Sequence, residues 1–301
     1  MPRGQPFTRM CQLLARPRHY GRADLHLHTT ASDGNYSPAE LLDLARRSGL
    51  AAMAVTDHDT LEGGRQTLDL RRAGDPAVIL GVEISVTWKG RDLHLLAYGM
   101  DGSDGALLAG LAAIRQRRVT RLLGALNQIR ARGLEIPDMV MPTVPGRRHL
   151  AQHLVATGHA ATVQQGIRRW LLGGAGVRLD AFGMPLPEAV EMVVLAGGFC
   201  SLAHPPEWIA MEQVTGLAGE GVQALEAEYP DFSAKRVAQL KTMAATAGMS
   251  VTGGSDCHGP GPRAPGCRSL SQEDFLKLPW NTSQWNLKPE EKACWEPSGK
   301  N

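Results

Sequence analysis

The segment that most constrains the fold is a short strand-like run at residues 23–28, Ala-Asp-Leu-His-Leu-His. Successive side chains of a strand point to opposite faces, so His26 and His28 share one face while Leu25 and Leu27 share the other. Two imidazoles on one face can bind a single metal ion, but two histidines in a partly buried strand give the same pattern. The rest of the chain decides between these interpretations.

The residues after this run indicate an alternation of strands and helices. Ser37, Pro38 and Glu40 have the spacing of a capping box that starts a helix, and Gly49 is placed to end it. The apolar run at 50–56 is typical of a strand buried on both faces. Strand, helix and strand in this order predict a right-handed parallel unit.

Similar patterns predict the remaining elements. Strands are expected over 77–86, 93–98, 198–203, 222–228 and 250–252, a hairpin turn over 88–91, and helices over 187–196 and 233–247. Between about 101 and 184 the chain is helical in character, with helices expected over 107–132, 149–157 and 162–172 and a glycine-rich break at 173–176. We therefore expect an α/β fold interrupted by a helical insert.

The composition excludes several classes of protein. The chain has 301 residues, 43% of them hydrophobic, so it can bury a large core. A net charge of +2 with both signs interspersed, and only 5% aromatic residues, gives no indication of a nucleic-acid or membrane surface. No apolar run approaches the roughly 18 residues of a membrane span.

The five cysteines include no C-x-x-C pair, which argues against a disulfide framework and against a thiolate zinc site. A reducing, cytoplasmic setting fits this pattern best. The first 22 residues contain five arginines and no acidic residue. A disordered basic leader over 1–21 is the interpretation we favour, with an organelle transit peptide as the alternative.

Residues that bind metals recur at or just beyond the ends of the predicted strands. They are His26, His28, His58, Glu83, His94, His204, Asp256 and His258, and Asp33 lies in the loop after the first strand. In α/β barrels and doubly wound sheets the active site forms at the carboxyl ends of the strands. Imidazole and carboxylate without thiolate suit zinc, manganese or iron better than calcium.

The motifs that carry these residues resemble a known family. Asp24-x-His26-x-His28, Thr56-Asp57-His58-Asp59, Gly81-x-Glu83, Ala203-His204-Pro205 and Gly254-Ser255-Asp256-x-His258 are similar, in order and spacing, to the polymerase and histidinol phosphatase (PHP) family. The resemblance covers residues 23–262. It is nearest to the stand-alone phosphoesterases that include nucleoside 3′,5′-bisphosphate phosphatases and a 5′-to-3′ exoribonuclease. It implies a distorted (β/α)7 barrel with two or three divalent metal ions, manganese foremost and zinc or iron as alternatives.

The resemblance also implies how the ligands divide. One metal would be bound by His26, His28, Glu83 and Asp256, a second by Glu83, His94 and His204, and a third by Asp33, His58 and His258. Asp24 and Asp57 are expected to orient neighbouring imidazoles from outside the metal shell. A metal-bound hydroxide would be the nucleophile, with no further catalytic residue.

Substrate recognition is expected from the insert. The segment from Gly146 to Ala151, Gly-Arg-Arg-His-Leu-Ala, resembles the G-R-P-H-I-A segment of these phosphoesterases, which assigns phosphate binding to Arg147 and His149. A solvated basic loop is the alternative. Two features depart from the family: a short, proline-rich segment at 137–146, and no histidine near 231–233.

The sequence thus predicts a PHP barrel over 22–102 and 185–270, a helical insert over 103–184 that forms part of the substrate pocket, and an irregular tail over 271–301. The expected function is metal-dependent hydrolysis of a phosphoester in a small phosphorylated substrate, such as a nucleoside 3′,5′-bisphosphate or a short 5′-phosphorylated RNA. The alternatives are an amidohydrolase-type C–N hydrolase and a non-catalytic metal-binding module. Neither a membrane nor an obligate protein partner is expected.

Overall fold

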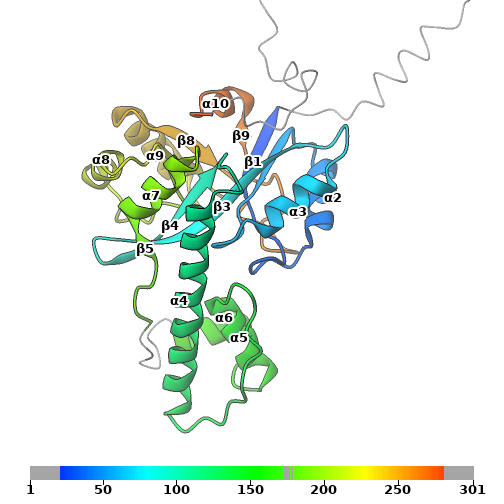
Figure 1. The fold of residues 1–301 in the computed structure, drawn as a ribbon, viewed down its shortest axis with the longest axis vertical. Coiled ribbons are helices and arrows are strands. Elements are labelled where there is room, and N and C mark those ends of the chain that lie inside the picture. Colours follow the sequence, from blue (N-terminus) through cyan, green and yellow to red (C-terminus); the bar gives the residue numbers. More distant parts are fainter. Residues whose placement is uncertain (1–20, 172–176, 178, 281–301) are drawn as a thin grey trace, which may run out of the picture.

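The computed structural model describes residues 21–171, 177 and 179–280. Its body is a mixed α/β barrel, from which one long helix projects with shorter helices packed along it (Figure 1). Residues 1–20 of the expected basic leader (1–21), the glycine-rich break at 173–176 and the tail beyond residue 280 lie outside the described residues.

A single curved sheet forms the wall of the barrel. Its main strands are β1 (Arg22–Leu27), β2 (Ala52–Val55), β3 (Ala77–Trp88), β4 (Arg91–Tyr98), β6 (Phe199–Leu202), β7 (Ala224–Glu228) and β8 (Ser250–Gly253). They are ordered β8-β7-β6-β4-β3-β2-β1. The sheet nearly closes where Leu27 pairs with Cys257, just beyond β8. The expectation of a distorted α/β barrel with a helical insert is confirmed.

The hairpin of β3 and β4 distorts the barrel. β4 runs antiparallel to both of its neighbours, β3 and β6, whereas the pairings of β1 with β2, β2 with β3, β6 with β7 and β7 with β8 are parallel. Lys89 and Gly90 make the turn with φ angles of 49° and 73°. Two successive positive φ angles match the twist of a tight hairpin, as the Lys-Gly pair predicts.

Helices cover the outside of the barrel and bury apolar side chains against it. They are α2 (Pro38–Arg47), α3 (Glu62–Leu70), α7 (Leu186–Leu195), α8 (Met211–Gly219) and α9 (Ala234–Thr246). The predicted capping box of α2 is present, with the Ser37 amide donating to Glu40 at 2.8 Å. α3 and α8 were not predicted. None of the described helices has the length and apolar character that a bilayer-spanning segment needs.

The insert is built on α4 (Gly105–Arg130), which is capped by the Asp104 carboxylate accepting from the Leu107 amide. α5 (Arg147–Ala156) and α6 (Val163–Gly166) pack beside its distal half, as Figure 1 shows. These helices share an apolar core of their own, which includes Leu126, Leu150 and Trp170. The helix expected over 162–172 is present from Val163 to Leu171, but it changes from an α-helix to a short π-helix at Ile167.

The expectation of an irregular tail from residue 271 is also wrong for its first residues. A two-residue strand, β9 (Leu270–Ser271), pairs antiparallel with the start of β1 and leads into α10 (Gln272–Leu276). The Trp280 indole donates to the Phe275 carbonyl at 2.8 Å, and its ring packs 5.0 Å from that of Phe199. This segment therefore closes the end of the barrel at which β1 begins.

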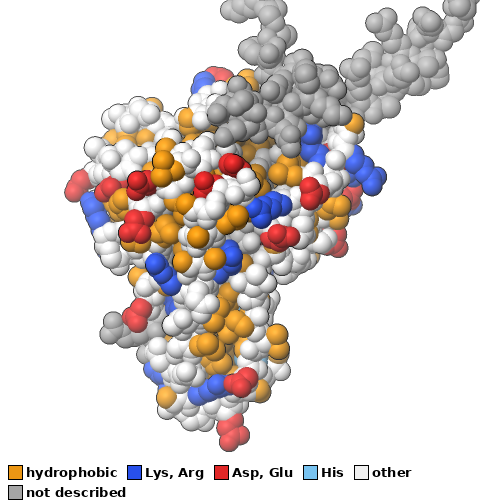
Figure 2. All heavy atoms as spheres, in the orientation of Figure 1, with side chains coloured by type: hydrophobic (Ala, Val, Ile, Leu, Met, Phe, Trp, Pro, Cys, Tyr) orange, Lys and Arg blue, Asp and Glu red, His pale blue; other side chains and the backbone are white. Residues whose placement is uncertain are grey.

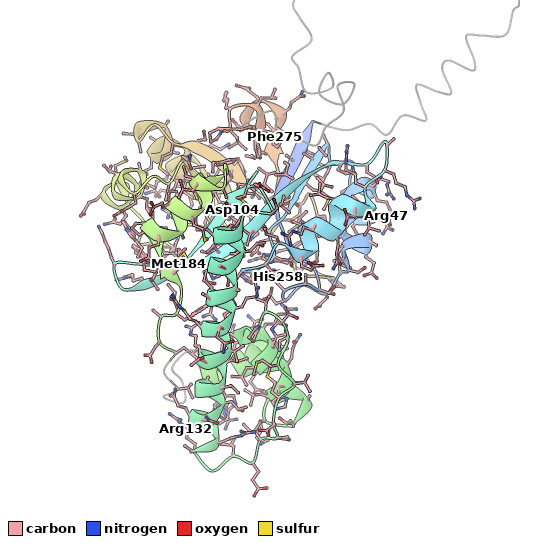
Figure 3. The ribbon with its side chains drawn as sticks, viewed as in Figure 1. Arg47, Asp104, Arg132, Met184, His258 and Phe275 are labelled. Carbon is pink, nitrogen blue, oxygen red and sulfur yellow. The ribbon has the colours of Figure 1, made fainter. Side chains whose placement is uncertain are left out.

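Acidic and basic side chains are interspersed over the face shown in Figure 2, in agreement with the small net charge. Figure 3 shows His258 where the barrel meets the insert, and Phe275 at the far end of the barrel. The junction of barrel and insert is therefore the end at which the predicted metal-binding residues lie.

Candidate metal centre

All nine predicted metal-binding side chains converge at one end of the barrel. They come from β1 and the loop after it (His26, His28, Asp33), the end of β2 (His58), the middle of β3 (Glu83), the start of β4 (His94), and the segments after β6 (His204) and β8 (Asp256, His258). Because β4 is antiparallel, its start lies at the same end of the sheet as the carboxyl ends of the parallel strands.

The first predicted set surrounds a single point. His26 Nε2 and His28 Nε2 lie 3.1 Å apart, and each is 3.2 Å from Glu83 Oε2. Asp256 Oδ1 lies 3.4 and 3.3 Å from the same two nitrogens. Ligand atoms about 2.1 Å from one metal ion lie roughly 3.0–3.4 Å from each other. The spacing therefore matches a shared ion.

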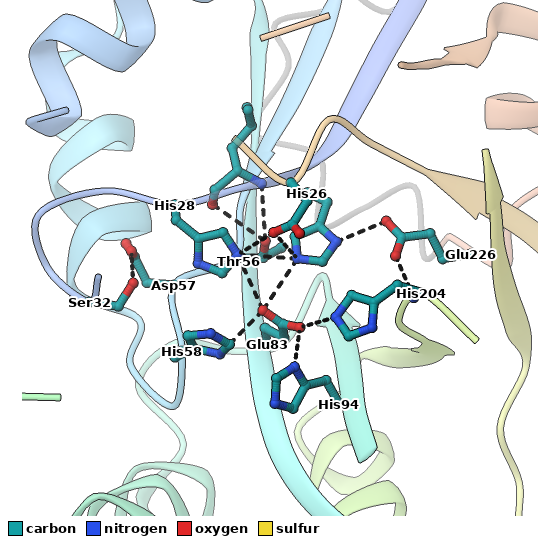
Figure 4. Close-up of polar contacts among 12 residues, drawn as sticks. His26, His28, Ser32, Thr56, Asp57, His58, Glu83, His94, His204 and Glu226 are labelled. Atoms are coloured by element: carbon teal, nitrogen blue, oxygen red, sulfur yellow. Dashed lines mark hydrogen bonds and ion pairs between the residues drawn. The ribbon is translucent and has the colours of Figure 1, made fainter. Parts of the chain in front are cut away.

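Glu83 lies at the centre of the cluster (Figure 4). Its second oxygen, Oε1, is 2.7 Å from His94 Nδ1 and 3.0 Å from His204 Nε2. Its Oε2 is also 3.2 Å from His58 Nδ1. One carboxylate thus contacts two groups of imidazoles, which is the geometry of a bridging ligand.

The third group gathers around Asp33. Its Oδ1 lies 3.3 Å from His258 Nε2, 3.9 Å from His58 Nε2 and 3.9 Å from His28 Nδ1. The three groups therefore overlap, because His28 adjoins the first and third groups and His58 adjoins the second and third. The sequence-based division had placed each of these two histidines in one group only.

The backbone at the centre is strained. Among the described residues, four non-glycine positions have positive φ, and three of them adjoin or belong to the cluster: Asp59 at 49°, His204 at 28° and Asp256 at 51°. Such conformations cost of order 1–3 kcal/mol each and persist only where surrounding contacts enforce them. Each lies just beyond the end of a strand, in the segment that carries residues of the cluster.

The carboxylates and imidazoles of the cluster shift each other's pKa toward the charged forms. Burial would raise the pKa of Glu83, but the imidazoles of His58, His94 and His26 outweigh it and hold the pKa well below its usual value. Burial would lower the pKa of His28, but the carboxylates of Asp256 and Glu83 raise it to about 10. Bound metal cations would replace the protons that the carboxylates hold on histidine rings such as that of His28.

The donor atoms left without hydrogen-bond partners point to the same conclusion. His28 Nδ1, Asp33 Oδ1, His58 Nδ1 and His94 Nδ1 are buried and make no hydrogen bond of acceptable geometry. Buried polar atoms normally have partners, and these four are nitrogen and oxygen atoms of the kinds that bind divalent cations. The residues present therefore fit a metal cluster.

Comparisons with known proteins agree with this geometry. The PHP domain model matches residues 24–133. A 5′-3′ exoribonuclease from Salmonella typhimurium is 30% identical over 256 residues, which cover 79% of this chain and 86% of that protein. The chain belongs to the PHP family.

Other relatives of this PHP chain span most of its length. A 3′,5′-nucleoside bisphosphate phosphatase from Chromobacterium violaceum is 29% identical, covering 79% of this chain and 87% of that protein. A solved structure described as an amidohydrolase, also from C. violaceum, has a TM-score of 0.74 at 28% identity and covers 83% and 91% of the two chains. A solved structure from Bifidobacterium adolescentis, provisionally assigned as a metal-dependent phosphoesterase, has a TM-score of 0.75 at 26% identity. The match covers 85% of this chain and 94% of that chain.

The orienting residue of this PHP centre that sequence reasoning missed is Glu226, in β7. Its Oε1 accepts from His26 Nδ1 at 2.8 Å, and its Oε2 accepts from the His204 backbone amide at 2.6 Å. It is fully buried. A glutamate between Leu225 and Ala227, in a strand that ends at the barrel rim, was the available indication, but a glutamate in a strand is also typical of a solvent-facing position.

The expected imidazole contacts of Asp24 and Asp57 are absent from the described structure. Asp24 accepts from the backbone amides of His26, Ser255 and Gly266. Asp57 accepts from the Thr29 amide and hydroxyl and from the Ser32 hydroxyl. Both carboxylates therefore fix the backbone of segments that carry metal-binding residues, rather than their rings.

A buried ion pair between Arg118 in α4 and Asp59 joins the insert to the barrel. Arg118 Nε donates to Asp59 Oδ2 at 2.5 Å, and its Nη2 donates to the Ser85 hydroxyl at 2.7 Å. Asp59 Oδ1 accepts from the Ser85 amide. This network, also missed from the sequence, fixes the residue that directly follows His58.

Of the two predicted phosphate-binding residues, Arg147 lies beside the centre, whereas His149 lines neither cavity there. Arg147 lines two cavities, a larger one with Asp33, His58 and His258 and a smaller one with His94 and His204. His149 Nδ1 accepts from the Gly146 amide at 3.1 Å, which leaves the ring proton on Nε2. Burial lowers the pKa of His149, so its ring is neutral at pH 7.

The segment at 231–233, where relatives in the family often have a histidine, forms an ion pair here. Asp231 accepts from Arg263, which also donates to Asp256 Oδ2 at 2.6 Å. The Tyr229 hydroxyl donates to the same oxygen at 2.8 Å. Asp256 is thus held through one oxygen by Tyr229 and Arg263, while its other oxygen faces the histidines.

Proposed function

We propose that this PHP enzyme hydrolyses a phosphoester bond in a nucleotide, with two or three divalent metal ions bound by the nine clustered side chains. The observation that carries the proposal is the position of Glu83, whose two oxygens face both groups of imidazoles. Relatives named for activity on nucleoside bisphosphates, RNA and a cyclic phosphate share phosphoester hydrolysis as their common reaction.

The ligand set supports manganese as the proposed ion, with zinc or iron as alternatives, because it combines imidazole with carboxylate. When bound, such ions lower the pKa of water and neutralise charge on phosphoryl oxygens. The three described cysteines, Cys200, Cys257 and Cys267, are free thiols, which supports the cytoplasmic setting that we also propose.

The chain's own residues would position the substrate. Arg147 stands between the two cavities at the cluster and presents a planar fork that pairs two phosphate oxygens. The neutral His149 ring would contribute an Nε2–H donor, since its Nδ1 is occupied by the Gly146 amide. Glu226 and Arg263 hold His26 and Asp256 in place while the charge on the phosphate changes.

We expect Arg147→Ala to lower kcat/KM for a phosphoester by about tenfold or more, because a bidentate charged contact is lost. Metal content measured by mass spectrometry should stay unchanged. The control is Arg47→Ala, which removes an exposed arginine on α2. Equal activity of Arg147→Ala and Arg47→Ala would contradict the role of Arg147.

The solved neighbour described as an amidohydrolase keeps C–N hydrolysis as the alternative. The deciding experiment gives the manganese-loaded chain adenosine 3′,5′-bisphosphate, a 5′-phosphorylated oligoribonucleotide, a cyclic nucleotide, an aryl phosphate and a set of N-acyl amino acids. We expect chelator-sensitive phosphate release from a nucleotide, well above that from the aryl ester. Amide cleavage without phosphate release would favour the alternative.

A further inference from the structure

A third cavity lies alongside α4, on the side of the insert that faces the β3–β4 hairpin. We call it the distal pocket. It has a volume of about 920 Å³, and the lining residues that matter here are Lys89, Arg117, Thr120, Arg121, Gly124 and Phe182. That volume is at the upper end of the range for pockets that enclose small ligands.

The distal pocket adjoins the metal centre. The smaller cavity beside the centre, of about 210 Å³, is lined by His94, His204 and Arg147, and also by Arg121 and Phe182. Arg121 and Phe182 therefore line both cavities. A ligand whose reacting group lies at His94 and His204 can extend past these two residues into the distal pocket.

The charge of this path is positive. The Arg121 guanidinium pairs with Asp92 at 3.0 Å and packs 4.6 Å from the Phe182 ring, while its buried Nε has no hydrogen-bond partner. Burial lowers the pKa of Arg121, and repulsion from Arg147 and Arg118 adds to this effect, while the carboxylates of Asp92 and Asp180 oppose it. An anion beside Arg121 would relieve that repulsion.

In the part of the chain that the structure describes, the positive charges farther along the path are not balanced by ion-pair partners. Arg117 donates to the Gly183 carbonyl, and Lys89 lies over the Trp88 ring at 4.5 Å. Among the described residues, no carboxylate lies within ion-pair distance of Arg117 or Lys89. Thr120 and Gln116 add hydroxyl and amide groups to the lining, and Asp180 adds one carboxylate against the three cations Lys89, Arg117 and Arg121. Spaced cations with neutral polar groups suit a phosphodiester backbone.

We propose that the distal pocket binds the nucleotide next to the reacting phosphoester, so that the enzyme prefers an oligonucleotide to a mononucleotide. This inference rests on the proposed function, because it assumes that a phosphoester reacts at the metal centre.

The direct test places a negative charge in the pocket. A Cβ on Gly124 meets no atom within 4 Å, so Gly124→Glu projects a carboxylate into the cavity without a backbone clash. The matched control is Leu123→Glu, which adds the same charge at the neighbouring exposed residue outside the lining. Gly124→Glu should lower kcat/KM for a 5′-phosphorylated oligoribonucleotide by about tenfold and leave adenosine 3′,5′-bisphosphate within about twofold of wild type.

A binding measurement supplies a second readout. Fluorescence anisotropy gives the binding constant of a labelled phosphorothioate oligonucleotide at several salt concentrations. For Arg117→Gln, the slope of the logarithm of the binding constant against the logarithm of the salt concentration should be smaller in magnitude than for wild type by about 0.7. That is the value for one lost phosphate contact to a single strand. Arg47→Gln on α2 removes an exposed charge and should leave the slope unchanged.

The outcomes distinguish the proposed phosphoesterase function from the proposed role of the distal pocket. Failure of the wild type on both substrates would overturn the proposed function. If the bisphosphate is turned over normally, and Gly124→Glu and Leu123→Glu lower kcat/KM for the oligonucleotide equally or not at all, only the proposal for the distal pocket is overturned.

Discussion

At the scale of single residues, the cluster depends on side chains that touch the histidines and not only on the histidines themselves. Glu226 accepts hydrogen bonds from both the His26 ring and the His204 backbone amide. A ligand's hydrogen-bonding partner fixes its tautomer and orientation, and loss of such a partner costs 10–100-fold in metal affinity or activity.

We therefore expect Glu226→Gln to weaken manganese binding by about 10–100-fold, because an amide cannot accept from both donors at once. Calorimetric titration with manganese measures this. Glu228→Gln is the control on the same strand, since Glu228 is paired with Lys241 and not with a cluster histidine. Equal affinities in the two variants would contradict the orienting role.

The pH dependence follows from His28. Its folded-state pKa of about 10 lies above the unfolded value of 6.5, so its stabilising contribution is complete below pH 6.5 and is lost as pH rises toward 10. Without metal, the melting temperature should therefore fall between pH 6.5 and 9. The increase in melting temperature on adding manganese should grow over the same range, because metal and proton compete for the ring.

Scanning fluorimetry with and without a chelator tests both trends. His28→Asn is the control and should flatten the metal-free profile. A metal-free melting temperature that rises from pH 6.5 to 9 would contradict the assignment.

The nine clustered residues could be predicted from the sequence because histidines and carboxylates recur where predicted strands end. Glu226 could not be predicted, since a glutamate in a strand more often faces solvent and its partner His26 lies 200 residues away in the chain. The roles of Asp24 and Asp57 were mistaken because the backbone amides that they bind leave no pattern in the sequence.

At the scale of elements, α3 and α8 show why some helices escape prediction. α3 contains Gly63 and Gly64, and glycine disfavours a helix interior by about 1 kcal/mol. The fold needs the first of them, because a Cβ at Gly63 would collide with Asp57 and Thr29. Close packing of the helix on the metal-centre loops outweighs its low intrinsic propensity.

The junction of α4 with the barrel yields a stability prediction. Arg118 is 8% exposed and Asp59 is fully buried, so Arg118→Met leaves an unpaired buried carboxylate. We expect the free energy of unfolding in urea to fall by about 3 kcal/mol or more.

The double variant Arg118→Met with Asp59→Asn should recover part of this loss, since no buried charge remains unpaired. If Arg118→Met is as stable as wild type, the ion pair does not hold the insert to the barrel.

At the scale of the whole molecule, the insert was predictable as a helical interruption, but its position was not. The distal half of α4 forms a separate apolar core with the helices beside it. The first half of α4 packs Leu107, Leu111 and Ile114 into the barrel core. It also binds Asp59 through Arg115 and Arg118. Nothing in local periodicity shows which face of a barrel such a unit covers. The position becomes evident only in three dimensions, where the cavities lined by Arg147 open at the metal centre.

The central proposal is that the converging side chains bind a metal cluster that hydrolyses phosphoesters. Glu83 is 1% exposed, and its oxygens lie within 3.2 Å of five imidazole rings. The most direct measurement is phosphate release from adenosine 3′,5′-bisphosphate by the manganese-loaded chain and by Glu83→Gln, with metal content determined on the same samples. We predict chelator-sensitive turnover by the wild type, and at least about 100-fold less activity with less bound metal in the folded variant. Turnover that survives both chelation and Glu83→Gln would contradict this proposal.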